Sequence, residues 1–252
     1  MKIYETVIIG SGYTSLGYAL SKGNSVIIEQ GETADVGFYL CLKNYYQGNY
    51  TPTTEAGKSL LKLYQSLNLI NDNEQNLSGF ECGFCEFVYQ NGLEILFKAR
   101  VVEINKEDDV YKLTLITSGG IDYLYAREIL DLTSATPDKK SLTILYHTDT
   151  PNQTENDLKN TFNGCTVEKA FYSDRYAVRI PVEIKEDFND CKIAIFERWK
   201  EAEIKAKILY FAPTFAKIYT TPNNAMQDGY YSNPFEAFEY GYNLANSQKE
   251  DK

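Results

Sequence analysis

Apolar and polar positions follow two different periods along the first 31 residues, and they predict two kinds of element. The apolar runs at residues 7–9 and 25–28 are short and unbroken, which is typical of fully buried strands. Between them, residues 14–22 place small and apolar side chains at helical spacing. The stretch therefore predicts a strand–helix–strand unit, which an acidic residue, Glu29, closes.

A glycine turn joins the first strand of this unit to its helix. Gly10 permits a tight turn, and Gly12 lets the backbone approach a ligand closely. The helix N-terminus that follows offers N–H groups and a positive dipole end to phosphates. Glu29 lies 29 − 10 = 19 residues after Gly10, where a dinucleotide fingerprint places the acid that binds a ribose. Ser15 replaces the third glycine of that fingerprint, so an ordinary turn without a ligand is the alternative.

The rest of the chain predicts a mixed architecture. The expected elements after residue 31 are a helix over 53–69, a three-stranded meander over 101–126, a buried strand over 128–134, an antiparallel sheet within 142–184, a long helix over 190–210 that carries Trp199, and a last helix opened by Asn233 and Pro234. We expect a larger domain of residues 1–137 and 211–252 and a smaller domain of residues 138–210.

Composition and charge narrow the classes of protein. The 252 residues carry 35 acidic and 25 basic side chains, which argues against binding to nucleic acid or to an anionic membrane. The sequence contains no apolar span of transmembrane length and no signal peptide pattern. Five cysteines, an odd number, fit a reducing compartment. We expect a cytoplasmic protein with a small-molecule substrate. Whether it forms a homo-oligomer or binds a protein partner stays open.

The order of these motifs resembles the FAD-dependent oxidoreductases of the glutathione-reductase-like fold. The segments that carry the resemblance are residues 10–15 (GSGYTS), 29–31 (EQG), 99–104 (ARVVEI) and 126–134 (AREILDLTS). The resemblance covers most of residues 4–136 and, more loosely, 220–246. It implies an α/β fold in which a Rossmann-like FAD-binding domain contains a three-stranded β-meander insertion. The smaller antiparallel sheet with its helix would be the substrate or cap domain.

The resemblance also implies which residues bind a non-covalent FAD. Gly10, Ser11, Gly12 and Ser15 would hold the pyrophosphate, Glu29 the adenosine ribose, Val101 or Val102 the adenine, and Thr133 and Ser134 the phosphate side. The other residues expected to contact the cofactor are Tyr13, Thr14, Gln30 and Gly37. The family pattern ends in Thr-Gly where this chain has Thr133-Ser134. The last helix would point its positive end at the flavin ring and stabilise the reduced form.

The resemblance implies hydride transfer from a small substrate to the flavin, between the two domains. The meander favours FAD over NAD, because plain NAD dehydrogenases usually continue with further strand–helix units. Two alternatives stay open. One is a nucleotide-binding ancillary subunit without catalysis, which the substitutions Ser15 and Ser134 support. The other is an NAD(P)-dependent dehydrogenase. No catalytic residue stands out, and no cysteine spacing predicts a metal site.

Other reactive side chains each have two interpretations. Cys82 and Cys85 form a C-x-x-C pair, which is either a redox dithiol or two small residues of a core or helix start. His147, the single histidine, is either an acid–base group over the flavin or a polar strand end. Arg175 and Arg179 share a strand face, where they either clamp a substrate carboxylate or pair with acidic residues.

Overall fold

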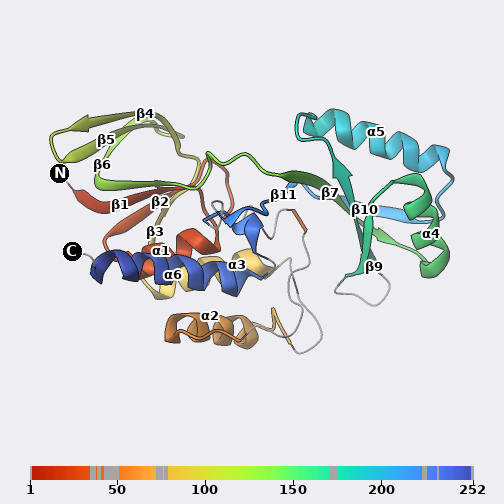
Figure 1. Cartoon of the computed structure of the whole chain (residues 1–252), viewed down its shortest axis with the longest axis horizontal. Coiled ribbons are helices and arrows are strands. Elements are labelled where there is room, and N and C mark those ends of the chain that lie inside the picture. Colours follow the sequence, from red (N-terminus) through yellow and green to blue (C-terminus); the bar gives the residue numbers. More distant parts are fainter. Residues whose placement is uncertain are drawn as a thin grey trace.

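The computed structural model describes residues 2–34, 38, 41–42, 51–71, 76, 79–170, 175–222, 226–231 and 233–250. These residues form two lobes, each organised on one β-sheet (Figure 1). The larger lobe, on the left of the view, contains both ends of the described chain. The smaller lobe, on the right, is formed by the middle of the sequence.

The larger lobe is organised on a six-stranded mixed sheet in the order β3-β2-β1-β6-β5-β4. Its strands are β1 (Ile3–Ile9), β2 (Ser25–Ile28), β3 (Glu94–Leu96), β4 (Arg100–Glu107), β5 (Val110–Thr117) and β6 (Gly120–Asp131). Strands β3, β2, β1 and β6 are parallel neighbours. Strands β4, β5 and β6 are antiparallel neighbours. Strand β6 therefore belongs to both halves of the sheet.

Successive residues of β1 and β2 point to opposite faces of the sheet, and each face packs against a different set of elements. Val7 and Val26 pack against Leu113 and other apolar residues of the antiparallel strands. Ile8 and Ile27 pack against the helices on the other side. Burial on both faces explains why these strands are unbroken apolar runs in the sequence.

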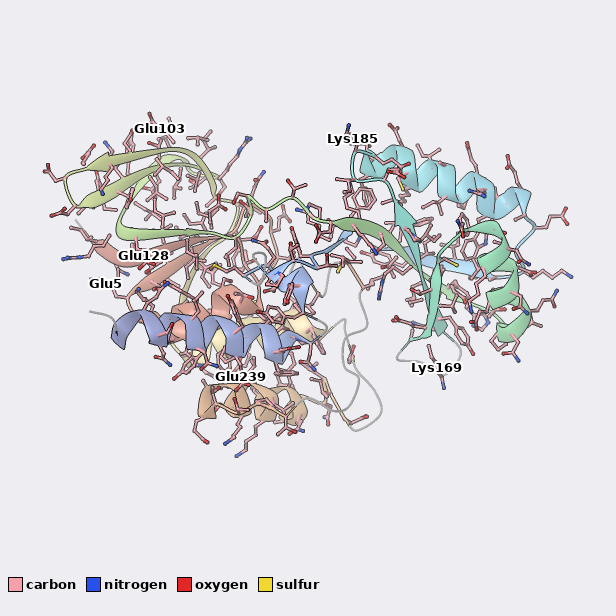
Figure 2. The ribbon with its side chains drawn as sticks, in the orientation of Figure 1. Glu5, Glu103, Glu128, Lys169, Lys185 and Glu239 are labelled. Carbon is pink, nitrogen blue, oxygen red and sulfur yellow. The ribbon has the colours of Figure 1, made fainter. Side chains whose placement is uncertain are left out.

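The helices of the larger lobe lie on one side of its sheet (Figure 1). They are α1 (Tyr13–Lys22), α2 (Glu55–Ser66), α3 (Phe80–Gln90) and α6 (Pro234–Glu250). Helices α1 and α6 cross at two glycines: a Cβ atom on Gly17 would lie 2.0 Å from the Phe238 carbonyl oxygen, and one on Gly241 would lie 2.0 Å from that of Thr14. Glu239 of α6, labelled in Figure 2, accepts the backbone N–H of Thr53 (3.0 Å) ahead of α2.

The smaller lobe contains a five-stranded antiparallel sheet. Its strands are β7 (Lys139–His147), β8 (Thr166–Lys169), β9 (Arg175–Val182), β10 (Lys207–Phe211) and β11 (Ala216–Ile218), in the order β10-β7-β9-β8 with β11 also on β7. Helices α4 (Pro151–Thr161) and α5 (Phe188–Glu201) share one core with it. Val178 and Ile180, two residues apart on β9, both face this core, and Trp199 lies within it.

Two predicted elements have different limits in the structure. The last strand of the meander expected over 101–126 and the strand expected over 128–134 form the single strand β6, because the chain continues extended through Arg127 without a turn. The helix expected over 190–210 was wrong in its second half: α5 ends at Glu201, and Glu203 adopts a φ of +50°. A left-handed residue is typical of a helix end.

The smaller sheet also extends beyond the expected limit at residue 210, since β11 pairs with β7 up to Ile218. In the described part of the chain, no helix is both long and apolar enough to cross a membrane. The same residues contain no group of three or more His, Cys, Asp and Glu side chains placed to hold a metal ion.

Candidate functional site

A cleft of about 260 Å³ opens at the carboxyl ends of β1, β2 and β6. One wall is the glycine turn with residues that follow β2 and β6, and the other wall comes from residues at and around β11. The residues that line it are Gly10, Ser11, Gly12, Glu29, Gln30, Leu132, Thr133, Thr214, Phe215, Lys217, Tyr219 and 226–229. In open α/β sheets, ligands bind outside the carboxyl ends of the parallel strands.

Glu29 follows β2 and is 8% exposed. Its Oε2 accepts the backbone N–H of Ser11 (3.0 Å) and the Ser11 hydroxyl (2.6 Å), while its Oε1 accepts the N–H of Gly31 (2.7 Å). A carboxylate has about four acceptor positions, so these three bonds leave room for one further donor. Glu29 therefore fixes the glycine turn and still offers an acceptor to the cleft.

Ser15 bonds to the turn itself. Its Oγ accepts the N–H of Gly12 (2.8 Å) and donates to the Gly12 carbonyl oxygen (2.7 Å). The side chain is fully buried, and it does not line the cleft. The serine that replaces the third glycine thus stabilises the first turn of α1 from within.

The N-terminus of α1 is bound by Asp228, which begins the short helix η3 (Asp228–Tyr230). Its Oδ2 accepts the N–H of Tyr13 (2.7 Å), and its Oδ1 accepts the N–H of Thr14 (2.9 Å). The carboxylate complements the positive end of the helix dipole. Tyr13 and Thr14 were predicted to bind the cofactor, and their N–H groups donate to this carboxylate.

The cleft brings together only part of the predicted set. The predicted residues that line it are Gly10, Ser11, Gly12, Glu29, Gln30 and Thr133. Val101, Val102 and Ser134 do not line it. Gly37 lies outside the described residues. The cofactor roles of all these residues stay predictions.

The sequence did not predict a role for Asp228 or for the residues around β11, because no element was expected between residue 210 and Asn233. Lys217 is a cation that lines the cleft from β11. The only local signal was the Asp228-Gly229 pair, which is common in turns. Neither residue belongs to the strand–helix–strand unit, so only the tertiary fold brings them to the glycine turn.

The cysteine pair lies on α3, away from the lining of the cleft. Cys82 and Cys85 are exposed and free. Cys85 is exposed as a whole residue, but partial desolvation of its thiol, together with Glu81 and Cys82, raises the pKa of that thiol. Redox-active thiols are usually those with a lowered pKa, so this environment favours the non-redox interpretation of the pair.

His147 and the two arginines also lie outside the cleft lining. His147 ends β7, where its Nε2 is 3.5 Å from a carboxylate oxygen of Asp149. Arg179 places an Nη atom 3.5 Å from a carboxylate oxygen of Glu168 on the neighbouring strand. This pair agrees with the ion-pair interpretation of Arg179.

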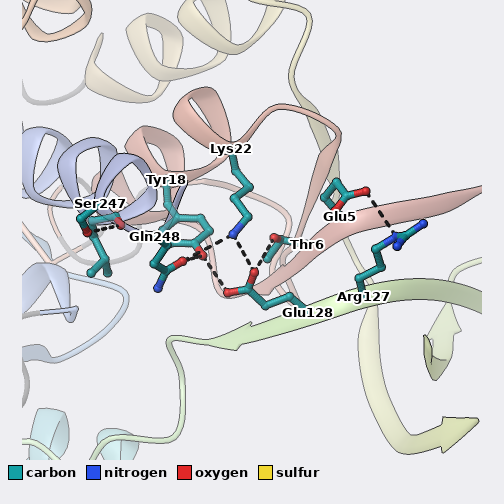
Figure 3. Close-up of polar contacts among 9 residues, drawn as sticks. Glu5, Thr6, Tyr18, Lys22, Arg127, Glu128, Ser247 and Gln248 are labelled. Atoms are coloured by element: carbon teal, nitrogen blue, oxygen red, sulfur yellow. Dashed lines mark hydrogen bonds and ion pairs between the residues drawn. The ribbon is translucent and has the colours of Figure 1, made fainter. Parts of the chain in front are cut away.

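A polar network fixes α1 relative to the sheet (Figure 3). Glu128 of β6 accepts the Tyr18 hydroxyl (2.9 Å) and the Lys22 ammonium (2.7 Å), both from α1. The same hydroxyl lies 2.6 Å from the Gln248 side-chain oxygen on α6. Burial and Glu128 raise the pKa of Tyr18. The network therefore joins the three elements that position the glycine turn.

Solved structures share this fold, although no family model and no curated protein matches the sequence. A p-nitrophenol 4-monooxygenase from Pseudomonas putida is 14% identical with a TM-score of 0.56, over 97% of this chain and 79% of that one. A geranylgeranyl bacteriochlorophyll reductase-like protein from Thermoplasma acidophilum is 12% identical with a TM-score of 0.60, over 99% and 79%.

A third structure, aklavinone-11 hydroxylase in a complex with FAD and aklavinone, is 11% identical with a TM-score of 0.54. The alignment covers 99% of this chain and 64% of the hydroxylase. At these identities the similarity establishes the fold alone, a mixed α/β fold of the Rossmann-like kind. These neighbours are a monooxygenase, a hydroxylase and a reductase-like protein, so they do not single out the glutathione-reductase-like group.

Proposed function

We propose that this chain is a flavoprotein oxidoreductase that holds FAD non-covalently in the cleft beside the glycine turn. The observation that carries the proposal is the meeting of Gly10, Gly12 and Glu29 at the carboxyl ends of β1 and β2. Aklavinone-11 hydroxylase, which shares the fold, is known with FAD. The substrate would be a small molecule, and the finer expectation of hydride transfer to the flavin belongs to this proposal.

Different residues of the cleft would bind different parts of FAD. Glu29 accepts a ribose hydroxyl, and the two glycines of the turn let the pyrophosphate approach the backbone. Phe215, Lys217 and Tyr219 close the cleft from the side of the smaller sheet. FAD, when bound, supplies the redox chemistry, and the protein supplies binding and orientation.

The residues fit FAD at the ribose end, where Glu29 lines the cleft and has one acceptor position left. At the phosphate end, the carboxylate of Asp228 already accepts the N–H groups of Tyr13 and Thr14. Binding of the pyrophosphate at these groups therefore requires Asp228 to leave them.

A second candidate is a nucleotide-binding ancillary protein without catalysis. The contact of Asp228 with α1 favours it, as does a cleft of about 260 Å³, because ligand-filled pockets are usually about 300–1,000 Å³. A bound flavin that accepts no electrons from NADH, NADPH or organic donors would support this candidate over the enzyme.

The visible spectrum of the purified protein, before and after incubation with FAD, tests the proposal. We expect a flavin spectrum that survives gel filtration and is bleached by dithionite. A folded protein that stays colourless after incubation with FAD would rule the proposal out. Parallel titration with NADH tests the dehydrogenase alternative.

Replacement of Glu29 by alanine is predicted to weaken FAD binding about 10- to 100-fold. A hydrogen bond to a charged group contributes about 1.5–3 kcal/mol, which gives this range. The measurement is a fluorescence titration with FAD. The control is Glu32→Ala, because Glu32 forms an ion pair with Lys98 and does not line the cleft. Equal affinity in Glu29→Ala and wild type, with both folded by circular dichroism, would remove the ribose role.

A further inference from the structure

The glycine turn presents its backbone N–H groups to acceptors of the chain itself. The pairs run in sequence: Ser11 N–H to Glu29, Gly12 N–H to Ser15, and the N–H groups of Tyr13 and Thr14 to Asp228. Of these acceptors, Asp228 is the one that lines the cleft and comes from outside the strand–helix–strand unit. A ligand phosphate at the start of α1 would need the N–H groups that Asp228 holds.

The carboxylate of Asp228 also fills the space that Gly12 leaves open. A Cβ atom at Gly12 would lie 2.3 Å from Asp228 Oδ2. The missing side chain of Gly12 therefore makes room for this carboxylate in the structure. A phosphate oxygen bound at the same place would need the same volume, so the two occupants exclude each other.

The charges of the cleft also oppose the binding of a pyrophosphate. Its charged lining residues are Glu29, Asp228 and Lys217, two carboxylates and one ammonium. A pyrophosphate adds negative charge beside Asp228, and like charges at such short range repel each other. Lys217 is an exposed cation among the lining residues, so a single positive charge stands against the two carboxylates.

We propose that Asp228 is the residue that determines the affinity of this cleft for dinucleotides, by competing with the ligand phosphates for the N–H groups of Tyr13 and Thr14. The proposal rests on the proposed function for the identity of the ligand. It assigns Asp228 a negative effect on binding, opposite to that of Glu29. A purely structural cap would act in the other direction, because its removal would loosen α1 and weaken binding.

The test is Asp228→Asn, which keeps the side-chain shape and removes the charge. We expect FAD, ADP and inorganic pyrophosphate to bind at least about tenfold more tightly than to wild type, because a neutral acceptor competes less well than a charged one. Adenosine carries no phosphate, and its affinity should not change. Isothermal titration with all four ligands gives this comparison.

The matched control is Asp138→Asn. The Asp138 carboxylate accepts the N–H (2.7 Å) and the hydroxyl (2.8 Å) of Thr220, so it also holds a backbone group, but it does not line the cleft. Its replacement should leave all four affinities unchanged. If Asp228→Asn does not fold, Asp228→Ser serves as the second variant, since serine has a short neutral acceptor.

The outcomes separate this inference from the proposed function. Wild type that binds FAD and a folded Asp228→Asn that binds it equally or more weakly would overturn the competition and leave the flavoprotein proposal intact. Tighter binding of pyrophosphate by Asp228→Asn, with no binding of FAD to either protein, would support the competition and overturn the flavoprotein proposal. Tighter binding of adenosine as well would overturn the competition, because the effect would not depend on phosphate.

Discussion

At the glycine turn, single side chains hold backbone groups that a bound phosphate would otherwise hold. Ser15 fixes Gly12, Glu29 fixes Ser11, and Asp228 fixes the start of α1. The contacts of Gly12, Tyr13 and Thr14 satisfy N–H groups at the helix start that no backbone carbonyl of the helix can accept. The turn is therefore well defined by the chain alone, and ligand affinity depends on how easily the most distant of these contacts is replaced.

At the scale of single residues, the environments of the cysteines predict the order in which they react. Burial and the nearby Glu186 raise the pKa of Cys191 to about 11. At about pH 8, we expect maleimide to label the exposed Cys82 readily, Cys85 more slowly, and Cys191 only after unfolding, because the thiolate reacts. Mass spectrometry of timed samples measures the order. Rapid labelling of Cys191 in the folded protein would contradict its buried environment.

The raised pKa of Cys191 also predicts how the stability of the protein changes at alkaline pH. An unfolded thiol has a pKa of about 8.5. A higher folded value means that the folded state keeps its proton longer, so the contribution of Cys191 to stability is complete below about pH 8.5 and declines towards pH 11. Cys191→Ala should reduce the alkaline loss of stability in urea titrations at increasing pH.

The sequence predicts the site residues that are close together along the chain and misses those that are far apart. Gly10, Gly12 and Glu29 belong to one strand–helix–strand unit, so their spacing alone places them together. Asp228 is 215 residues from Tyr13 along the chain, and the tertiary fold brings the two together. No local pattern around Asp228 indicates that its carboxylate faces a helix start.

At the scale of elements, the crossing of α1 and α6 sets the position of the turn. Gly17 and Gly241 let the two backbones approach, and the network around Glu128 fixes both helices to β6. Periodicity predicted the buried strands and most helices because burial on one or two faces is a local property. It missed the continuity of β6 and the end of α5, which depend on pairing partners and on the left-handed Glu203.

Replacement of Gly17 by alanine is predicted to destabilise the larger lobe by about 1–3 kcal/mol, the usual cost of an overpacked contact. The new Cβ would lie 2.0 Å from the Phe238 carbonyl oxygen, a backbone atom that cannot move by itself. Urea unfolding followed by far-UV circular dichroism measures the loss. Gly119→Ala is the control, because its Cβ would meet nothing closer than 3.7 Å. Equal stability of the two variants would contradict the close crossing.

At the scale of the whole molecule, two sheets with separate cores meet at one cleft. The core around Trp199 lies in the smaller lobe, while the glycine turn belongs to the larger one. The sequence predicted two sheets, but it placed the boundary at residue 210, and β11 carries the smaller sheet to Ile218. The wall that β11 adds to the cleft could not be predicted, because short strands carry little periodic signal.

Trp199 is the single tryptophan, and it reports on the smaller lobe. The two lobes have separate cores, and separate cooperative units of a protein can unfold with different stabilities. We therefore expect Gly17→Ala to lower the urea midpoint measured by circular dichroism while leaving the midpoint of Trp199 fluorescence unchanged. Equal shifts of both midpoints would show that the lobes unfold as one cooperative unit.

The flavoprotein account is tested most directly by an equilibrium titration of the purified, folded protein with FAD, followed by flavin fluorescence. The account predicts saturable binding of one flavin per chain, which Glu29→Ala weakens and Asp228→Asn strengthens. Wild type and Asp228→Asn that both remain folded and bind no FAD would contradict it.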